Sequence, residues 1–135
     1  MSWRQSLIRI STYEVEVLQK RLAEVVDRRE QVEMRLAVLE AEASSEVDHA
    51  RRNGDAALRL NAYMDGVRQR RARIGEEINQ IGLEELGARD ALAEAFESLK
   101  KFEHVAEMAK IAERRETGRR EAAALDELGL RVRAG

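Results

Sequence analysis

The stretch Arg51-Arg52-Asn53-Gly54-Asp55 separates two long helical patterns and decides how they are arranged. Asn-Gly-Asp is the strongest turn signal in the chain, because asparagine and glycine both tolerate a positive φ angle. We therefore predict an all-α fold in which two long helices form an antiparallel coiled-coil hairpin. A continuous helix that dimerises along its length is the alternative.

Both patterns repeat apolar residues at the alternating four- and three-residue spacing of a coiled coil. We call these positions the seam. The seam of the first pattern consists of Ile8, Ser11, Val15, Leu18, Leu22, Val25, Arg29, Val32, Leu36, Leu39 and Ala43. That of the second pattern consists of Ala57, Leu60, Met64, Val67, Arg71, Ile74, Ile78, Ile81, Glu85, Ala88, Leu92, Ala95, Leu99, Phe102, Ala106 and Ala109.

We expect residues 1–135 to form a single helical-hairpin domain. Its first arm covers about residues 4–50, its turn about 51–57 and its second arm about 58–112. Each arm has about 50 residues and is therefore about 75 Å long. Ser2, followed three residues later by Gln5, predicts a capping box at the start of the first helix.

The charged seam residues predict the register of the two arms. An unpaired buried charge is costly, whereas opposite charges that face each other are tolerated and can fix alignment. Placing Arg29 opposite Glu85 also brings Arg71 near Glu46. The same register sets the start of the first arm against the end of the second seam, so residues 113–135 overhang the hairpin as a lone helix.

The overhanging segment carries a stripe of Leu125, Leu128 and Val132 at positions i, i+3 and i+7. We call it the C-terminal stripe. A lone helix with such a stripe normally docks into a groove or ring of a partner. A frayed tail is the alternative, because Gly118 and Gly129 weaken the helix by roughly 1 kcal/mol each relative to alanine.

Composition supports long helices and excludes several classes of protein. Alanine, glutamate, arginine, leucine and lysine make up about 58 % of the chain, aromatic residues only 4 %, and proline is absent. Without cysteine there is no disulfide frame and no thiolate site. The net charge of −2 argues against a general nucleic-acid binder. We expect a cytoplasmic protein, because no apolar stretch approaches ~18 residues and no secretory segment begins the chain.

No group of residues predicts catalysis. Glu46 and His49 have the three-residue spacing used in di-metal bundles, which need a second such pair. The only other histidine, His104, has Lys101 and not a glutamate three residues before it. There is no Walker-type phosphate loop, and a two-helix rod offers no concave site. We expect no enzyme activity, no cofactor and no metal.

The turn region is basic. Residues 51–73 carry a net charge of +5, whereas residues 74–99 carry −6. The basic residues fit an acidic protein surface, nucleic acid or anionic lipid, or simply a solvated helix face. They are Arg51, Arg52, Arg59, Arg68, Arg70, Arg71 and Arg73.

Several stretches of the chain, in this order and spacing, resemble the FliJ family of the bacterial flagellar type III export apparatus. The first is Ser6-Leu-Ile-Arg-Ile-Ser-Thr-Tyr-Glu-Val-Glu-Val-Leu-Gln-Lys-Arg-Leu-Ala, and the second is Leu60-Asn-Ala-Tyr-Met. The C-terminal stretches are Leu99-Lys-Lys-Phe-Glu, Glu113-Arg-Arg-Glu, Arg119-Arg-Glu and Leu125-Asp-Glu-Leu.

The resemblance implies a non-enzymatic stalk located in the cytoplasm and peripheral to the inner membrane at the flagellar base. The end with both termini would enter the hexameric export ATPase and promote its assembly and activity. The hairpin body would contact the cytoplasmic linker of the membrane export gate through Tyr63, Val67 and Arg70, and the protein would also bind export chaperones. The residues facing the ATPase would be Leu7, Ile8, Leu125, Asp126, Glu127, Leu128 and Val132.

Two other functions stay open at this point. One is a self-associating structural coiled coil, in which the arms pair between chains. The other is a nucleic-acid or anionic-surface binder that acts through the basic turn region, with an affinity that falls steeply with salt.

Overall fold

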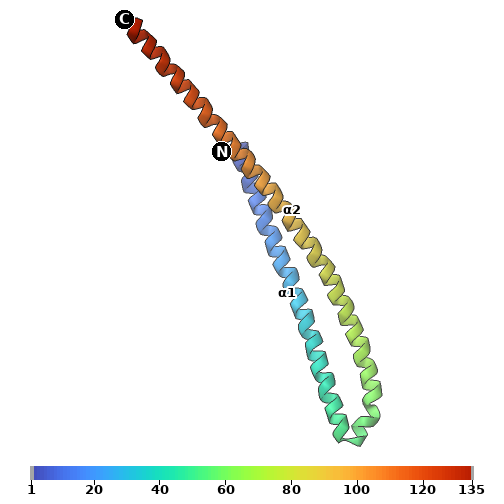
Figure 1. Ribbon diagram of the computed structural model, residues 1–135. Helices are drawn as coiled ribbons and strands as arrows, with labels where there is room; N and C mark the ends of the chain where they lie inside the picture. Colours follow the sequence, from blue (N-terminus) through green and yellow to red (C-terminus); the bar gives the residue numbers. More distant parts are fainter. Residues whose placement is uncertain (1, 135) are drawn as a thin grey trace. The chain divides into compact units, whose positions relative to one another are not determined.

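The computed structural model describes residues 2–134, and the two ends of the expected domain, Met1 and Gly135, lie outside the described residues. The described chain consists of helix α1 (Trp3–Arg52) and helix α2 (Gly54–Ala134), without a strand (Figure 1). The prediction of an all-α fold with two long helices packed against each other is confirmed. By their contacts the residues form two compact units, 16–93 and 2–15 together with 94–134.

A single residue, Asn53, connects the two helices. Its side-chain Oδ1 accepts a hydrogen bond from the Asp55 N–H at 3.0 Å, and its carbonyl accepts one from the Ala57 N–H at 3.1 Å. Asn53 is thus the N-cap of α2. None of residues 2–134 has a positive φ angle, so the cause that we gave for the turn is wrong. The chain reverses because Asn53 ends one helix and caps the next.

The start of α1 has the capping box that the sequence predicts. The Ser2 N–H donates to Gln5 Oε1 at 3.2 Å, and the Gln5 N–H donates to Ser2 Oγ at 3.3 Å. Two N–H groups at this end of the chain, which have no partner within the helix, are thereby satisfied.

Two apolar clusters form the core of the unit made by residues 16–93. The first consists of Val25, Val32 and Ile81, with Ile74 and Ile78 packed against it. The second consists of Leu39, Ala43 and Val67, with Tyr63, Met64 and Ile74 packed against it. Because Ile74 contacts both clusters, the core is continuous along the two helices.

The other unit packs the start of α1 against α2. Ser11, Val15 and Ala95 are buried here, and Leu99 and Phe102 are half-buried. In the chain as a whole, every predicted seam position except Ala57 is buried or half-buried. The repeat therefore identified the packed face of both helices.

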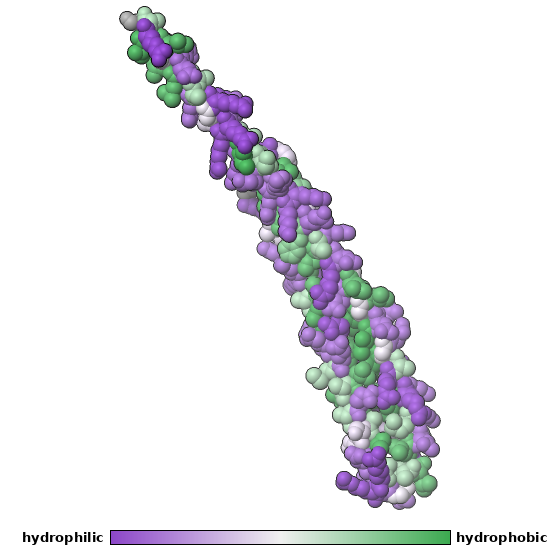
Figure 2. Space-filling model, in the orientation of Figure 1, coloured by the Kyte–Doolittle hydropathy of each residue, from purple (hydrophilic) through white to green (hydrophobic). Residues whose placement is uncertain are grey.

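Within this second unit, α2 continues well past the start of α1 (Figure 1). Ile111 is the last half-buried residue, and each of residues 112–134 is exposed. Figure 2 shows apolar surface at this end of α2 among charged side chains. The segment has no partner helix among the described residues.

We predict that Leu39→Ala lowers the free energy of unfolding by about 2 kcal/mol, because it leaves a cavity in a core that is only two helices wide. Leu39 is 5 % exposed. The control is Met34→Ala on the same helix, where the side chain is 64 % exposed and the expected change is within about 0.5 kcal/mol. Urea unfolding followed by circular dichroism measures both, and equal losses would contradict this packing.

We predict that Asn53→Ala costs about 1 kcal/mol of stability, because the N-cap bond to the Asp55 N–H is lost. Asn61→Ala is the matched control. Asn61 lies exposed inside α2, where alanine is the better helix former, so this variant should be as stable as the wild type or slightly more so. Thermal unfolding of both variants shows whether the loss of stability is specific to the capping position or follows wherever alanine replaces an asparagine.

Candidate partner-binding surfaces

The residues expected to face an ATPase ring lie in the unit of residues 2–15 and 94–134. Leu7 and Ile8 are half-buried. Leu125, Leu128 and Val132 are 68 %, 55 % and 73 % exposed, so the whole C-terminal stripe faces solvent. Asp126 and Glu127 are also exposed, and Glu127 accepts a bond from Arg131 at 3.0 Å. The stripe is accessible to a partner, whereas Leu7 and Ile8 partly serve the packing of their own unit.

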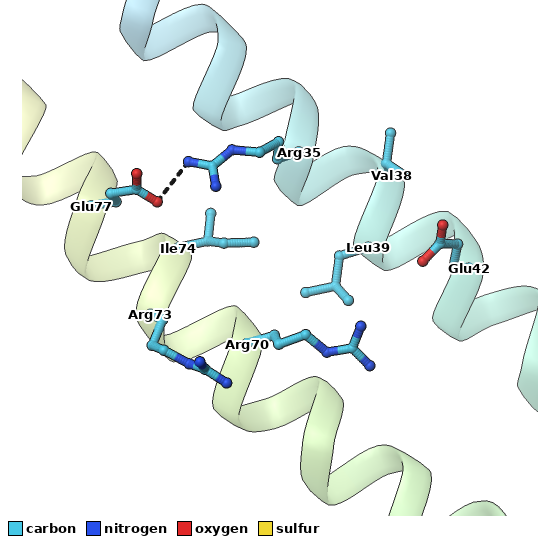
Figure 3. A pocket seen from close by; sticks show the side chains of 8 residues that line it. All are labelled: Arg35, Val38, Leu39, Glu42, Arg70, Arg73, Ile74 and Glu77. Atoms are coloured by element: carbon cyan, nitrogen blue, oxygen red, sulfur yellow. Dashed lines mark hydrogen bonds and ion pairs between the residues drawn. The ribbon is translucent and has the colours of Figure 1, made fainter.

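A groove of about 400 Å³ lies between α1 and α2 in the unit of residues 16–93 (Figure 3). Leu39 and Ile74 lie at its centre, and charged side chains surround them. The groove is lined by Arg35, Val38, Leu39, Glu42, Arg70, Arg73, Ile74 and Glu77. We expected no concave surface on a two-helix rod, and this expectation is wrong: two helices leave open furrows along their contact line.

A second groove of about 290 Å³ lies beside the turn. Its lining includes Glu46, His49, Asn53, Arg59 and Tyr63. Glu46 and His49, which were considered as metal ligands, both line it. Within residues 2–134 no three carboxylate, imidazole or thiol side chains come together as a metal site would need.

The three residues expected to contact an export gate have different environments. Arg70 is exposed and lines the groove around Leu39 and Ile74, and Tyr63 is half-buried and lines the groove beside the turn. Val67 is 0 % exposed and packs with Leu39 and Ala43 in the core. The prediction that Val67 contacts a partner is wrong, because no atom of its side chain can be reached. Its seam position already indicated a core residue.

The basic turn region is partly neutralised by ion pairs within the chain. Arg51 lies 3.6 Å from Asp48, and Arg68 lies 2.6 Å from Asp65. Among the described residues no ion pair includes Arg52, Arg59, Arg70 or Arg73. These four arginines are therefore the ones that keep charge available for a partner.

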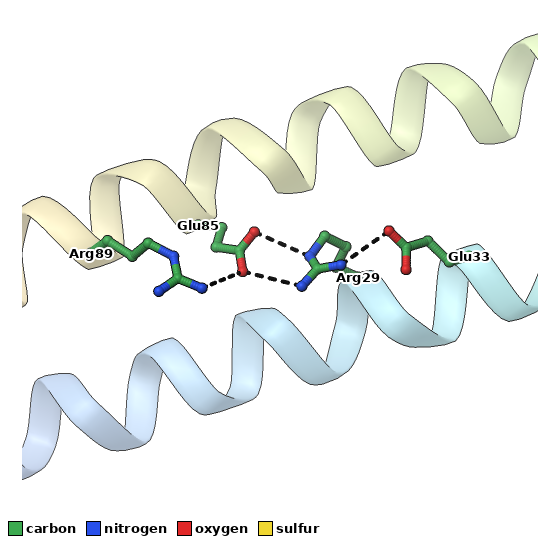
Figure 4. A network of polar contacts seen from close by, with 4 residues as sticks. All are labelled: Arg29, Glu33, Glu85 and Arg89. Carbon is green, nitrogen blue, oxygen red and sulfur yellow. Dashed lines mark hydrogen bonds and ion pairs between the residues drawn. The ribbon is translucent and has the colours of Figure 1, made fainter.

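An ion-pair network crosses the seam within the unit made by residues 16–93 (Figure 4). Arg29 and Glu85, which were expected to face each other, are joined by bonds of 3.1 Å from Nε and 3.4 Å from Nη2. Glu33 accepts a further bond from Arg29 at 3.0 Å, and Arg89 donates to Glu85 at 3.1 Å. The Glu85 side chain is only 14 % exposed and that of Arg29 only 28 %.

The network keeps the seam charges ionised. Partial burial on its own raises the pKa of Glu85, but the bonds donated by Arg89 and Arg29 outweigh it and hold the pKa below the ordinary value of 4.5. The bonds to Glu33 and then to Glu85 raise the pKa of Arg29. Both groups are charged at neutral pH, so the pair fixes the alignment of the two helices.

Arg71 has a different partner from the one predicted. Arg71 pairs with Glu40, at 2.5 Å and 2.9 Å, and the prediction that it lies near Glu46 is wrong. In the register of the Arg29–Glu85 pair, Ala43 lies opposite Arg71, and Glu40 and Glu46 lie about one helical turn away on either side of it. The pairs Arg28–Glu84 and Arg35–Glu77 are seven residues apart on both helices, so the register is constant over this stretch and Arg71 reaches Glu40 within it.

One exposed surface was missed in the sequence. Trp3, Ile10 and Tyr13 are 62 %, 63 % and 68 % exposed. At about 100° per residue these three side chains lie within an arc of about 80° on α1. The buried Ser11 and Val15 lie outside this arc. Their spacing of seven and three residues was visible, but the stronger seam pattern of the same helix obscured it.

Within residues 2–134, neither helix contains a stretch long and apolar enough to cross a membrane.

Two long helices packed against each other through a heptad repeat define the class of coiled-coil proteins. Residues 5–134 match the family model described as "Flagellar FliJ protein", and the chain belongs to the FliJ family. The family is a structural component related to flagellar protein export.

Two curated relatives support this membership. They are the flagellar FliJ proteins of two strains of Caulobacter vibrioides, each 51 % identical to the chain over 129 residues. The matched region covers 96 % of this chain and 93 % of each relative. No solved structure matches the chain.

We predict that the stability of the protein falls as the pH drops below 4.5, the ordinary pKa of a glutamate side chain. A carboxylate whose pKa is lowered by folding contributes stability that is complete above its unfolded pKa and is lost as the pH falls through its folded pKa. The bond donated by Arg71 lowers the pKa of Glu40 in the same way, so both glutamates contribute.

The test is the variant Glu85→Gln. It should be less stable than the wild type at pH 7 and should lose less stability on acidification, with Glu40 accounting for the remaining loss. Glu121→Gln, in the exposed end of α2, serves as the control and should keep the wild-type profile. A Glu85→Gln profile parallel to that of the wild type over the acid range would mean that the pair does not titrate as described.

Proposed function

We propose that the protein is a non-enzymatic stalk of the flagellar export apparatus, which binds the ring of the export ATPase through the C-terminal part of α2. In this role it promotes assembly of the ring and its hydrolysis of ATP. Family membership supports a role related to flagellar export. The ATPase is our choice of partner within that apparatus.

The observation that carries the proposal is the exposure of residues 112–134 together with the C-terminal stripe. Over these residues α2 has no partner helix in the described chain, yet Leu125, Leu128 and Val132 form an apolar row on it. Leaving such a row in water is unfavourable, and burying a leucine in a partner recovers about 1.5–3 kcal/mol. A helix that lays an apolar face into a groove is a common mode of protein recognition.

A stalk of this kind acts through differential binding. One helix inside a ring of identical subunits cannot make the same contacts with all of them, so it favours one subunit conformation over the others. Its effect on the ATPase is limited to the difference between its affinities for those conformations. Within this proposal the chain contributes no chemical group to hydrolysis.

The other end of the hairpin has a second role in the proposal. Arg70 and Tyr63, each in a groove, contact the cytoplasmic linker of the export gate, and export chaperones bind the same stalk. The stalk is then cytoplasmic and lies at the flagellar base, peripheral to the inner membrane through its partners. The exposed arginines Arg59, Arg70 and Arg73 support an acidic protein surface as the partner of this end.

The test mixes the purified chain with the export ATPase of the same organism and follows hydrolysis and ring assembly as the chain is added. We expect saturable stimulation by the wild type. Leu128→Glu should raise the concentration needed for half-maximal stimulation by about tenfold or more, because the apolar contact is replaced by a charge.

Leu130→Glu is the matched control, because Leu130 is 65 % exposed on the same segment but lies about 140° around the helix from Leu125. It should stimulate as the wild type does. Equal effects of the two variants would argue against a role for the stripe. No binding or stimulation by the wild type would refute the ATPase as the partner.

A further inference from the structure

The side of α2 that is turned away from α1 carries a second heptad repeat. Between residues 59 and 90 its members precede the seam positions of α2 by one or two residues, so they keep the period of the seam. At about 100° per residue they lie about 150° around the helix from it. We call these residues the outer row. It consists of Arg59, Ala62, Gly66, Gln69, Arg73, Glu76, Gln80, Leu83, Gly87 and Asp90, all exposed except the half-buried Gly66.

The charges of the outer row are separated along the helix. Arg59 and Arg73 lie in its first half, and Glu76 and Asp90 lie in its second half. None of the ion pairs within residues 2–134 includes any of these four side chains. Glu76 accepts a hydrogen bond from the neutral Gln80 at 3.2 Å. All four charges are therefore available to another molecule.

The outer row is complementary to a second copy of itself that runs in the opposite direction. When two antiparallel rows are centred between Arg73 and Glu76, Arg59 of one copy lies opposite Asp90 of the other. Arg73 then lies opposite Glu76. Because such a pair of copies has two-fold symmetry, each of these ion pairs forms twice.

The uncharged positions fit in the same alignment. Leu83, which is 64 % exposed, lies opposite Gly66 of the other copy. Gly66 has no side chain there, and a Cβ atom added to it would meet nothing within 4 Å, so the leucine finds open space. Gln69 lies opposite Gln80, and side-chain amides both donate and accept hydrogen bonds.

Other alignments of two copies lose the ion pairs. A parallel copy sets each charged residue against the same residue, and like charges repel. An antiparallel copy shifted by one heptad in either direction leaves Arg73 opposite Gln69 or Leu83. The charges of the outer row thus select one direction and one register.

The alignment also has defined ends. The next positions of the repeat are Asp55 and Glu94, which would face each other with like charges. The contact therefore covers residues 59–90, about 45 Å of helix. It is mainly polar, so we expect weak association that salt weakens further.

We propose that the outer row binds a second copy of the chain, as an antiparallel dimer in which each hairpin keeps its own seam. Nucleic acid and anionic lipid are disfavoured as occupants, because the acidic half of the row repels them. The proposal goes beyond the stalk function and does not depend on the ATPase. Arg59 and Arg73 are also among the arginines of the proposed gate contact, so the dimer and the gate-bound form exclude each other.

The test exchanges charges between two variants of the full chain. One carries Arg59→Glu with Arg73→Glu, and the other carries Glu76→Arg with Asp90→Arg. Sedimentation equilibrium at low salt should show a concentration-dependent dimer of the wild type. Each variant alone should dimerise about tenfold more weakly or worse, because every pair between its copies then repels. An equimolar mixture of the two should dimerise as the wild type does, because every pair is again between opposite charges.

Arg115→Glu with Arg119→Glu is the matched control, because it makes the same change of charge at exposed positions outside the outer row. It should dimerise as the wild type does. Circular dichroism should show the helicity of the wild type in all variants, since every substituted side chain is exposed.

Each other outcome overturns the proposal in a defined way. A mixture that fails to dimerise, or a charge variant that alone dimerises as the wild type does, overturns the alignment. A wild type that stays monomeric at low salt overturns the dimer, whereas the stalk function is measured with the ATPase and is unaffected. Dissociation of the dimer by Leu128→Glu would assign it to the C-terminal stripe instead.

A second arm tests the direction of the two copies by disulfide formation, since the chain has no cysteine of its own. Under mild oxidation, Gln69→Cys mixed with Gln80→Cys should give a disulfide-linked dimer, because these positions face each other. Gln69→Cys alone should not. Crosslinking of Gln69→Cys with itself would indicate parallel copies and overturn the antiparallel dimer.

Discussion

The pair of Arg29 and Glu85 is the constraint on which the packing of the hairpin depends. Two helices bury one narrow row of side chains each, and most of the buried residues are valine, alanine and isoleucine, whose repeat also permits pairing in registers shifted by a heptad. A guanidinium and a carboxylate in the same row have one favourable alignment, because each loses water and needs the other. The pair therefore defines the register of α1 against α2, which the apolar residues alone leave open.

A sequence with a single dominant repeat reveals its packed face, and for this reason the fold could be predicted well. The seam residues, the capping box at Ser2 and the pairing of Arg29 with Glu85 follow from local rules of spacing and charge. The partner of Arg71 could not be predicted, because Glu40 and Glu46 lie one turn on either side of the position opposite Arg71 and the register alone does not choose between them. The turn was predicted at the right place for the wrong physical cause, since Asn53 acts there as an N-cap and no residue from 2 to 134 has a positive φ angle.

The candidate surfaces were predicted less completely than the fold. The C-terminal stripe was visible because no competing pattern shares its segment. Trp3, Ile10 and Tyr13 were missed because they share a helix with the stronger seam, and Val67 was misassigned because resemblance outweighed its seam position. In a chain made of heptads, the residues available for binding are those that the packing repeat does not explain.

The single-residue connection at Asn53 has a consequence for the order in which the hairpin closes. Contacts next to the connection join residues close in sequence, so each added turn of pairing closes only a short loop, as in a zipper. Contacts of the first fifteen residues with α2 join the most distant parts of the chain and form last. The open end is then the first to separate in native fluctuations, so protease nicking and hydrogen exchange are expected to begin there.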